Sequence, residues 1–155
     1  MGLVRILVDG YSLLHHWPAL APGKARYSSA AREELIHRLT QYFDACGTPI
    51  TIVFDGATGI GSASEPPSTR EVEILYSRLG QTADQIIERV AHRLATHGQV
   101  LVVTDDYAER DTASSGGAMT SSCFNFIQEV ENALSELESK IQNYNRDERR
   151  KFKSH

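Results

Sequence analysis

The sequence predicts an α/β domain whose central, mainly parallel sheet is covered by helices on both faces. Three apolar segments of similar form support this prediction: LVRILVDG at 3–10, PITIVFDG at 49–56 and QVLVVTDD at 99–106. Each is rich in Val, Ile and Leu and runs into an aspartate. Near-continuous apolar strands separated by helical stretches are typical of parallel sheets buried on both faces. We therefore expect the three strands to end at the same edge of the sheet.

Two amphipathic helices are predicted between these strands. In the segment 28–47, apolar residues recur at spacings of three and four, a serine can cap the first turn and a glycine can end the helix. In the segment 82–98, Thr82 can accept a hydrogen bond from the backbone amide of Gln85. The apolar stripe of this second helix consists of Ile86, Ile87, Val90 and Leu94.

The remaining segments predict a fourth strand, a final helix and two loops. Alternation of apolar and acidic residues at 70–77 predicts a strand near an edge of the sheet. Gly, Ser and Pro make 56–69 and 112–119 flexible by composition. A long helix is expected from residue 121 or 122 to about residue 143. Its predicted apolar face comprises Phe124, Ile127, Val130, Leu134, Leu137 and Ile141.

Length and composition indicate one domain with one sizeable core, because the chain has 155 residues, of which 41% are hydrophobic. There is no secretory leader pattern and no run of eighteen apolar residues, so we expect a soluble, cytoplasmic protein without a membrane partner. Cys46 and Cys123 lie 77 positions apart, which predicts ordinary free thiols. No sequence feature predicts an oligomeric state.

Charge is unevenly distributed along the chain. Residues 140–155 contain six basic and two acidic residues, a surplus of four positive charges. Since the formal net charge is −4, residues 1–139 carry −8. A basic end of this kind is common in solvated helix ends, and it is also typical of a contact with nucleic acid or the ribosome.

Five carboxylates are predicted to meet at one edge of the sheet. Asp9, Asp55, Asp105 and Asp106 follow the strands, and Asp84 lies in the first turn of a helix. Without a Lys or Arg among them these carboxylates would repel strongly, because two unit charges 4 Å apart repel by about 4 kcal/mol at an effective dielectric constant near 20. Oxygen ligands point to Mg²⁺ or Mn²⁺, and hence to metal-assisted hydrolysis of a nucleic-acid backbone. Any one of these residues alone could equally be a turn or cap residue.

Other α/β chemistries fit the residues less well. A phosphoaspartate hydrolase of the haloacid type needs Asp-x-Asp after its first strand, whereas Asp9 is followed by Gly10 and Tyr11. A response-regulator receiver needs an acidic pair after the first strand and a lysine after a late one, and both are missing. Neither G-x-x-x-x-G-K-[ST] nor G-x-G-x-x-G occurs, so nucleotide binding by a glycine-rich loop is unsupported.

Four motifs, in their order, resemble the YacP-like NYN-domain proteins, a branch of the PIN-like nucleases. They are ILVDGYSLL (6–14), IVFDG (52–56), REVEILYSRLGQTADQIIE (70–88) and VVTDDYAER (102–110). The resemblance spans roughly residues 3–140. It implies a PIN-like three-layer α/β/α sandwich over 1–143, followed by a basic tail at 144–155. It also implies a divalent-metal endoribonuclease that uses Mg²⁺ or Mn²⁺, in a family that includes a ribosome-associated enzyme cutting mRNA during translation.

The resemblance also implies roles for individual residues. Asp9, Asp84 and Asp106 fall on the acidic catalytic and metal-site positions, with Asp55 as a further metal ligand. Asp105 stands where a small polar residue such as serine is usual, so we interpret it as extra charge beside the site. The family pattern reads VDGYN, and this chain has Ser12 in place of the Asn. Ser12 could still bind a ligand carboxylate or water, and Thr82 and Thr104 could orient neighbouring carboxylates.

Further residues are candidates for RNA contacts. Arg70 and Arg110 could bind phosphate, since guanidinium groups suit bidentate recognition of phosphate oxygens. Tyr11 and Tyr107, each near a candidate aspartate, could stack on an unpaired base. Adjacent histidines rarely share one metal, so we interpret HHWP at 15–18 as a loop with a hydrophobic anchor.

Three functions remain open from the sequence. The first is a metal-dependent endoribonuclease acting on mRNA, in which a metal-activated water attacks the phosphodiester. The second is an RNA- or ribosome-binding module of the same fold, with weak or no catalysis, that docks through its basic tail and glycine-rich loops. The third is a structure-specific DNA nuclease, because recognition of the 2′-hydroxyl leaves no short motif.

Overall fold

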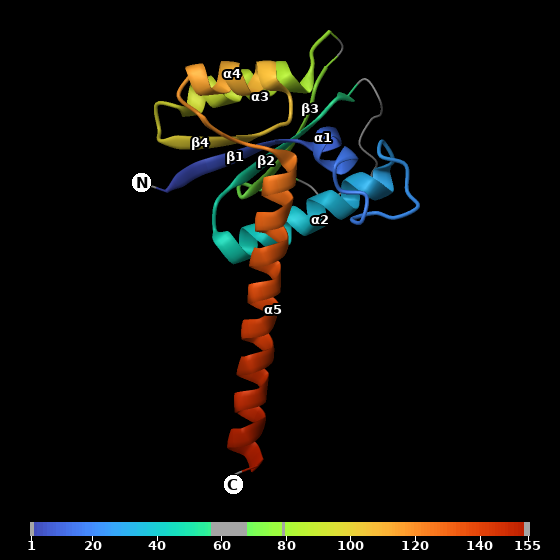
Figure 1. The fold of residues 1–155 in the computed structure, drawn as a ribbon, viewed down its shortest axis with the longest axis vertical. Coiled ribbons are helices and arrows are strands. Elements are labelled where there is room, and N and C mark those ends of the chain that lie inside the picture. Colours follow the sequence, from blue (N-terminus) through green and yellow to red (C-terminus); the bar gives the residue numbers. More distant parts are fainter. Residues whose placement is uncertain (1, 57–67, 79, 154–155) are drawn as a thin grey trace.

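A five-stranded sheet forms the middle layer of the protein (Figure 1). The computed structural model describes residues 2–56, 68–78 and 80–153. The strands are β1 (Leu3–Asp9), β2 (Ile50–Phe54), β3 (Val72–Tyr76), β4 (Gln99–Val103) and β5 (Met119–Ser121). They lie in the order β3-β2-β1-β4-β5, and every neighbouring pair is parallel. The predicted parallel sheet is thus confirmed, with β3 at an edge as expected.

Helices cover both faces of this sheet. They are α1 (Gly10–His15), α2 (Ser29–Cys46), α3 (Ala83–Leu94), α4 (Tyr107–Ser115) and α5 (Cys123–Lys153). The first two helices and the start of α5 pack against one face, and α3 and α4 pack against the other (Figure 1). The predicted three-layer α/β/α sandwich is therefore confirmed.

The two faces of the sheet contribute to two separate hydrophobic clusters. Along β2, Ile52 and Phe54 belong to the cluster beneath α2 and α5, whereas Val53, between them, belongs to the cluster beneath α3. All three side chains are fully buried. Because successive strand residues point to opposite faces, burial on both sides requires the unbroken apolar runs seen in the sequence.

Both predicted crossover helices begin at the expected caps, and α2 also ends at its expected glycine, whereas α3 ends at Leu94, before the predicted end at Gly98. Ser28 accepts a hydrogen bond from the amide of Ala31 at the start of α2, and Gly47 ends this helix with a φ of 77°. At the start of α3, Thr82 and Gln85 form a reciprocal capping box. These caps satisfy backbone groups that have no partner within the helix.

The segment 112–119, predicted as a flexible loop, is instead part of α4, a turn and the start of β5. Sequence pattern could not reveal α4, because none of its residues is buried and it therefore has no apolar stripe. The strand β5 has three residues, too few for a periodic signal. The other predicted loop, 56–69, lies mostly outside the described residues.

The final helix differs from its prediction in length and in its buried face. It continues to Lys153, well beyond residue 143, and so passes without a break through the predicted boundary between domain and tail. Cys123 and Phe126 are buried at its start, whereas Phe124 is 66% exposed. Its second half projects away from the body (Figure 1). None of the described helices is long and apolar enough to cross a membrane.

Strand order creates a natural binding edge. The chain places β2 and β3 on one side of β1 and places β4 and β5 on the other, so the order reverses between β1 and β4. In open α/β sheets, ligands bind outside the carboxyl ends of the strands at such a reversal. Asp9 is the last residue of β1, and Asp105 and Asp106 come soon after the end of β4.

We predict that Gly10→Ala destabilises the protein, because a Cβ at this position would lie 2.3 Å from the ring of Phe54. This ring is fully buried and contacts the rings of Tyr11 and Tyr76, so a shift of Phe54 would disturb both of them. Overpacking of this kind costs about 1–3 kcal/mol in the free energy of unfolding. Urea denaturation measures the effect.

Gly116→Ala is the matched control for this substitution. A Cβ there would meet its nearest neighbour at 3.5 Å, which is an ordinary contact. Equal stability of the two variants would contradict the packing argument.

Candidate metal centre

Acidic side chains from separate elements meet at the carboxyl edge of the sheet. Asp9, Asp55 and Asp84 line one pocket. Asp84 also lines an adjoining cavity of about 650 Å³, together with Asp106 and Glu109. The two pockets share Asp84, and Asp106 lines only the second, so the four aspartates predicted to hold a metal lie along one edge of the sheet rather than in one pocket. The structure adds a glutamate that sequence reasoning missed.

Asp9 joins β1 to α1 and caps that helix. Its Oδ1 accepts a hydrogen bond of 3.2 Å from the amide of Ser12. Burial raises the pKa of the Asp9 carboxyl, and the nearby charge of Asp84 raises it further, although hydrogen bonds from the amide and hydroxyl of Ser12 oppose the shift. The serine that replaces the expected Asn thus contacts Asp9 directly.

Asp55 follows β2 and is held by Ser77, the residue that follows the neighbouring strand β3. The hydroxyl of Ser77 donates to Asp55 Oδ1 at 3.1 Å and accepts from the amide of Gly56 at 2.9 Å. A Cβ on Gly56 would lie 2.1 Å from the carbonyl oxygen of Ser77. Only glycine permits this close approach of the two chain segments.

Asp84 is placed by the start of α3, within the first turn where the helix dipole favours an anion. The hydroxyl of Thr82 accepts from the amide of Gln85, and the Gln85 side chain accepts from the amide of Thr82. Thr82 therefore fixes the end of the helix that carries Asp84. The Thr82 hydroxyl binds the backbone amide of Gln85 and not a site carboxylate of the described residues.

Glu109 lies in the first turn of α4 and faces the aspartates. Burial raises the pKa of its carboxyl to about 8, and the carboxylates of Asp84 and Asp9 contribute to this shift, although the hydrogen bond from Thr104 opposes it. Glu109 Oε2 accepts from the Thr104 hydroxyl at 2.8 Å. Among the described residues, its buried Oε1 has no hydrogen-bond partner. Thr104 was predicted to orient a neighbouring carboxylate, and the carboxylate that it contacts is that of Glu109.

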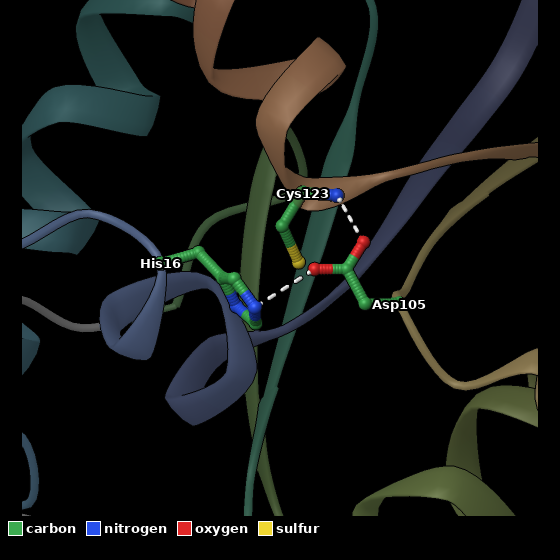
Figure 2. A group of neighbouring side chains, drawn as sticks. All are labelled: His16, Asp105 and Cys123. Atoms are coloured by element: carbon green, nitrogen blue, oxygen red, sulfur yellow. Dashed lines mark hydrogen bonds and ion pairs between the residues drawn. The ribbon is translucent and has the colours of Figure 1, made fainter.

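Asp106 and Asp105 point to different surroundings. Asp106 caps α4 by accepting from the amides of Ala108 and Glu109. Asp105 instead pairs with His16 Nε2 at 3.0 Å and accepts from the amide of Cys123 at 3.0 Å (Figure 2). Asp105, interpreted from the sequence as extra charge, thus contacts His16, interpreted as part of a structural loop.

The predicted RNA-contacting residues differ in their placement. The ring of Tyr11 is buried between Tyr27 and Phe54, so in this structure it packs in the core. Tyr107 is 78% exposed, and the guanidinium of Arg110 lies 5.9 Å from the centre of its ring. Both lie at the start of α4, close to the acidic edge.

Arg70 is not brought to the site. It precedes β3, whereas the site lies where the parallel strands end. Its carbonyl oxygen accepts from Arg5, which also binds Thr51 in the first half of β2. Arg70 therefore lies at the amino edge of the sheet, away from the acidic edge, and its contact with RNA phosphate stays a prediction.

One arginine that the sequence did not indicate lines the acidic pocket. Arg26 lies in the segment between α1 and α2 and lines the pocket of Asp9, Asp55 and Asp84. Its guanidinium hydrogen-bonds His15 and the hydroxyl of Tyr27. Among the described residues, its buried Nε has no hydrogen-bond partner. Arg26 thus adds a positive charge to the lining of the acidic pocket.

This donor set fits a hard divalent cation. Hard cations such as Mg²⁺ take oxygen ligands, and carboxylate oxygens are the groups that crowd together here. The pKa values of Asp9 and Glu109 are both raised, in part by the charges of neighbouring carboxylates. Without a metal, the site therefore binds protons more readily than an isolated carboxylate does, and a cation would relieve the same repulsion. The unpartnered Oε1 of Glu109 offers a further oxygen.

Comparison with known proteins identifies the family. The chain matches the family model of the YacP-like NYN domain over residues 6–155. It belongs to this family. The uncharacterized protein YacP of Bacillus subtilis (strain 168) is 31% identical over 137 residues, which are 88% of this chain and 80% of YacP.

Solved structures of the YacP-like NYN family show the same fold. The crystal structure of Rae1 (YacP) from Bacillus subtilis matches with a TM-score of 0.81 at 29% identity, covering 96% of this chain and 84% of that one. Its W164L mutant matches with a TM-score of 0.77 over 92% and 84% of the two chains. The resemblance seen in the sequence is confirmed, and the chain has the PIN-like nuclease fold of this NYN family.

We predict that the metal-free protein loses stability as the pH rises from about 5 to 8, and that Glu109→Gln reduces this loss. The folded protein keeps the Glu109 proton up to a pKa of about 8, whereas the unfolded chain releases it near the ordinary value of 4.5. In this range the folded state binds more protons, so the free energy of unfolding falls with increasing pH. Thermal unfolding in EDTA at several pH values measures the slope.

Glu136→Gln is the control for this measurement, because Glu136 lies on the exposed part of α5. It should keep the slope of the wild type. A Glu109→Gln slope equal to that of the wild type would show that Glu109 does not hold the proton.

Proposed function

We propose that this YacP-like protein is a divalent-metal-dependent endoribonuclease that hydrolyses mRNA in a ribosome-associated setting in the cytoplasm. The observation that carries the proposal is the meeting of carboxylates from β1, β2, α3 and α4 at the carboxyl edge of a PIN-like sheet. The raised pKa values of Asp9 and Glu109, together with the buried Oε1 of Glu109, support a cation at this edge over a purely structural role for the carboxylates.

Asp9, Asp84 and Asp106, with Asp55, would hold the cation in this proposal. When bound, Mg²⁺ or Mn²⁺ supplies Lewis-acid polarisation of a phosphate oxygen and activates a water for attack. The protein's own contribution is to keep the carboxylates in place. Ser12 orients Asp9 and Ser77 orients Asp55, each through a hydrogen bond to the carboxylate.

Arg26 and Tyr107 are our candidates for contacts with the RNA itself. The guanidinium of Arg26 lines the same pocket as three aspartates. Its Nε–H has no hydrogen-bond partner among the described residues, and a phosphate oxygen could accept this hydrogen bond. Tyr107 exposes its ring beside the site and could stack on an unpaired base, which every base permits. Arg110 stacks near this ring and stays a candidate phosphate contact.

The charge distribution favours a substrate delivered by a larger assembly. Residues 1–139 carry a net charge of −8, which opposes binding of free RNA. Arg146, Arg149, Arg150 and Lys151 are exposed on α5, whose second half projects away from the body (Figure 1). Because the basic residues and the acidic edge are separate, a second function is also a candidate. In it, α5 binds RNA or the ribosome, and the acidic edge has little or no nuclease activity.

We predict that Asp9→Asn and Asp84→Asn each lower cleavage at least about 100-fold, because each removes a ligand charge from the cation. The assay uses an end-labelled unstructured RNA, with and without translating ribosomes, in Mg²⁺, Mn²⁺ or EDTA. EDTA should abolish cleavage by the wild type. A DNA strand of the same sequence tests the DNA-nuclease alternative.

Asp147→Asn is the control, since Asp147 is exposed near the end of α5. It should cleave as the wild type does. Full activity of Asp9→Asn would refute the assignment. If no condition gives cleavage while truncation after residue 143 abolishes ribosome binding, the binding module is the correct function.

We predict that Arg26→Ala lowers kcat/KM by about 10- to 100-fold and reduces the salt dependence of RNA binding, because one phosphate contact is lost. Arg70→Ala is the matched control, since Arg70 lies at the opposite edge of the sheet. Steady-state cleavage at several salt concentrations distinguishes the two variants. Equal effects would mean that Arg26 has no special contact with the substrate.

A further inference from the structure

A second group of side chains that could bind a metal lies beside the acidic edge. His16 follows α1, Asp105 lies in the turn between β4 and α4, and Cys123 begins α5. One ligand atom from each lies within 4.8 Å of the other two. Figure 2 shows the imidazole, the carboxylate and the thiol pointing toward one another. Three segments distant in the sequence thus converge on one point.

Hydrogen bonds from the backbone orient two of these side chains. His16 Nδ1 lies 2.8 Å from the carbonyl oxygen of Ser12, to which it can donate its proton. Asp105 Oδ1 accepts from the amide of Cys123. These bonds leave His16 Nε2 and Asp105 Oδ2 facing each other at 3.0 Å. Histidine ligands of metals usually donate their other ring N–H to a carbonyl or carboxylate in this way.

We propose that His16, Asp105 and Cys123 form a binding site for Zn²⁺. Imidazole nitrogen, thiolate sulfur and carboxylate oxygen are all zinc ligands, whereas Mg²⁺ prefers oxygen alone. Ligand atoms of a tetrahedral zinc site lie about 3.4–3.6 Å apart, by the usual bond lengths. The partly exposed side chains of His16 and Asp105 need only small movements to reach these separations.

The charges of this site balance when zinc binds. Binding releases the thiol proton of Cys123 to solvent, so that a thiolate and the Asp105 carboxylate neutralise the two positive charges of Zn²⁺. Cys123 is fully buried, and a neutral cluster avoids the cost of an isolated buried charge. A metal ion can reach the site from the side of His16, because this side chain is 40% exposed and lines the acidic pocket. Solvent can supply a fourth ligand from that side.

This zinc site is distinct from the cation of the proposed nuclease and does not depend on that function. Its ligands include nitrogen and sulfur, and none of them is among the four aspartates of the proposed cation site. Bound zinc would link the end of α1 and the β4–α4 turn to the first residue of α5. Zinc binding should therefore stabilise the fold whether or not the protein cleaves RNA.

Cobalt substitution tests the site without any activity measurement. Metal-free full-length protein is titrated with Co²⁺, and the thiolate-to-cobalt charge-transfer band is followed in the near ultraviolet. We expect one equivalent of Co²⁺ to give this band, and one equivalent of Zn²⁺ to abolish it and raise the melting temperature. Cys123→Ser should lose the band. Cys46→Ser, at an exposed free thiol, should keep it.

Two further variants keep the test decisive. His16→Ala alters a partly exposed side chain and should weaken Co²⁺ binding tenfold or more even if Cys123→Ser fails to fold. Asp9→Asn should retain the band, because Asp9 is not a ligand of this site. The proposal is overturned if the wild type gives no band, if Cys123→Ser keeps it, if Cys46→Ser or Asp9→Asn loses it, or if His16→Ala binds Co²⁺ as tightly as the wild type.

Discussion

Electrostatic repulsion among carboxylates at one edge of the sheet is the constraint on which the rest of this site depends. Parallel strands that end together bring Asp9 and Asp55 to the same side, and the start of α3 adds Asp84. The fold could have relieved this crowding with several basic residues, yet it holds the acids in place with serine, threonine and backbone donors. Such neutral donors fix the geometry while leaving the negative potential available to a cation.

Two glycines make this crowding possible. Gly10 and Gly56 each directly follow an aspartate at a strand end, and in both cases a Cβ would collide with a neighbouring segment. At Gly10 the obstacle is a buried aromatic ring, and at Gly56 it is a carbonyl oxygen of the adjacent connection. The repeated Asp-Gly pairs of the sequence therefore combine a charge with the close packing that brings the charges together.

The sequence was sufficient to predict the sheet, the long helices and the strand-end aspartates, because each depends on local pattern and on the rule that parallel strands end together. Glu109 was missed because α4 has no buried face to reveal it. Arg26 and His16 were missed because tertiary packing of the α1–α2 segment places them, which no local pattern encodes. The position of Arg70 at the opposite edge follows from the same parallel rule, because Arg70 precedes β3.

The long helix α5 extends the molecule well beyond the sheet and its covering helices. Only the first turns pack on the sheet, through residues such as Phe126 and Val130. Beyond Leu134 the helix continues to Lys153, which at 1.5 Å per residue is about 28 Å of projecting rod. Whatever its basic end touches is thereby kept at a set distance from the acidic edge. The length of the helix sets this distance, and adding or removing one turn would change it by about 5.4 Å.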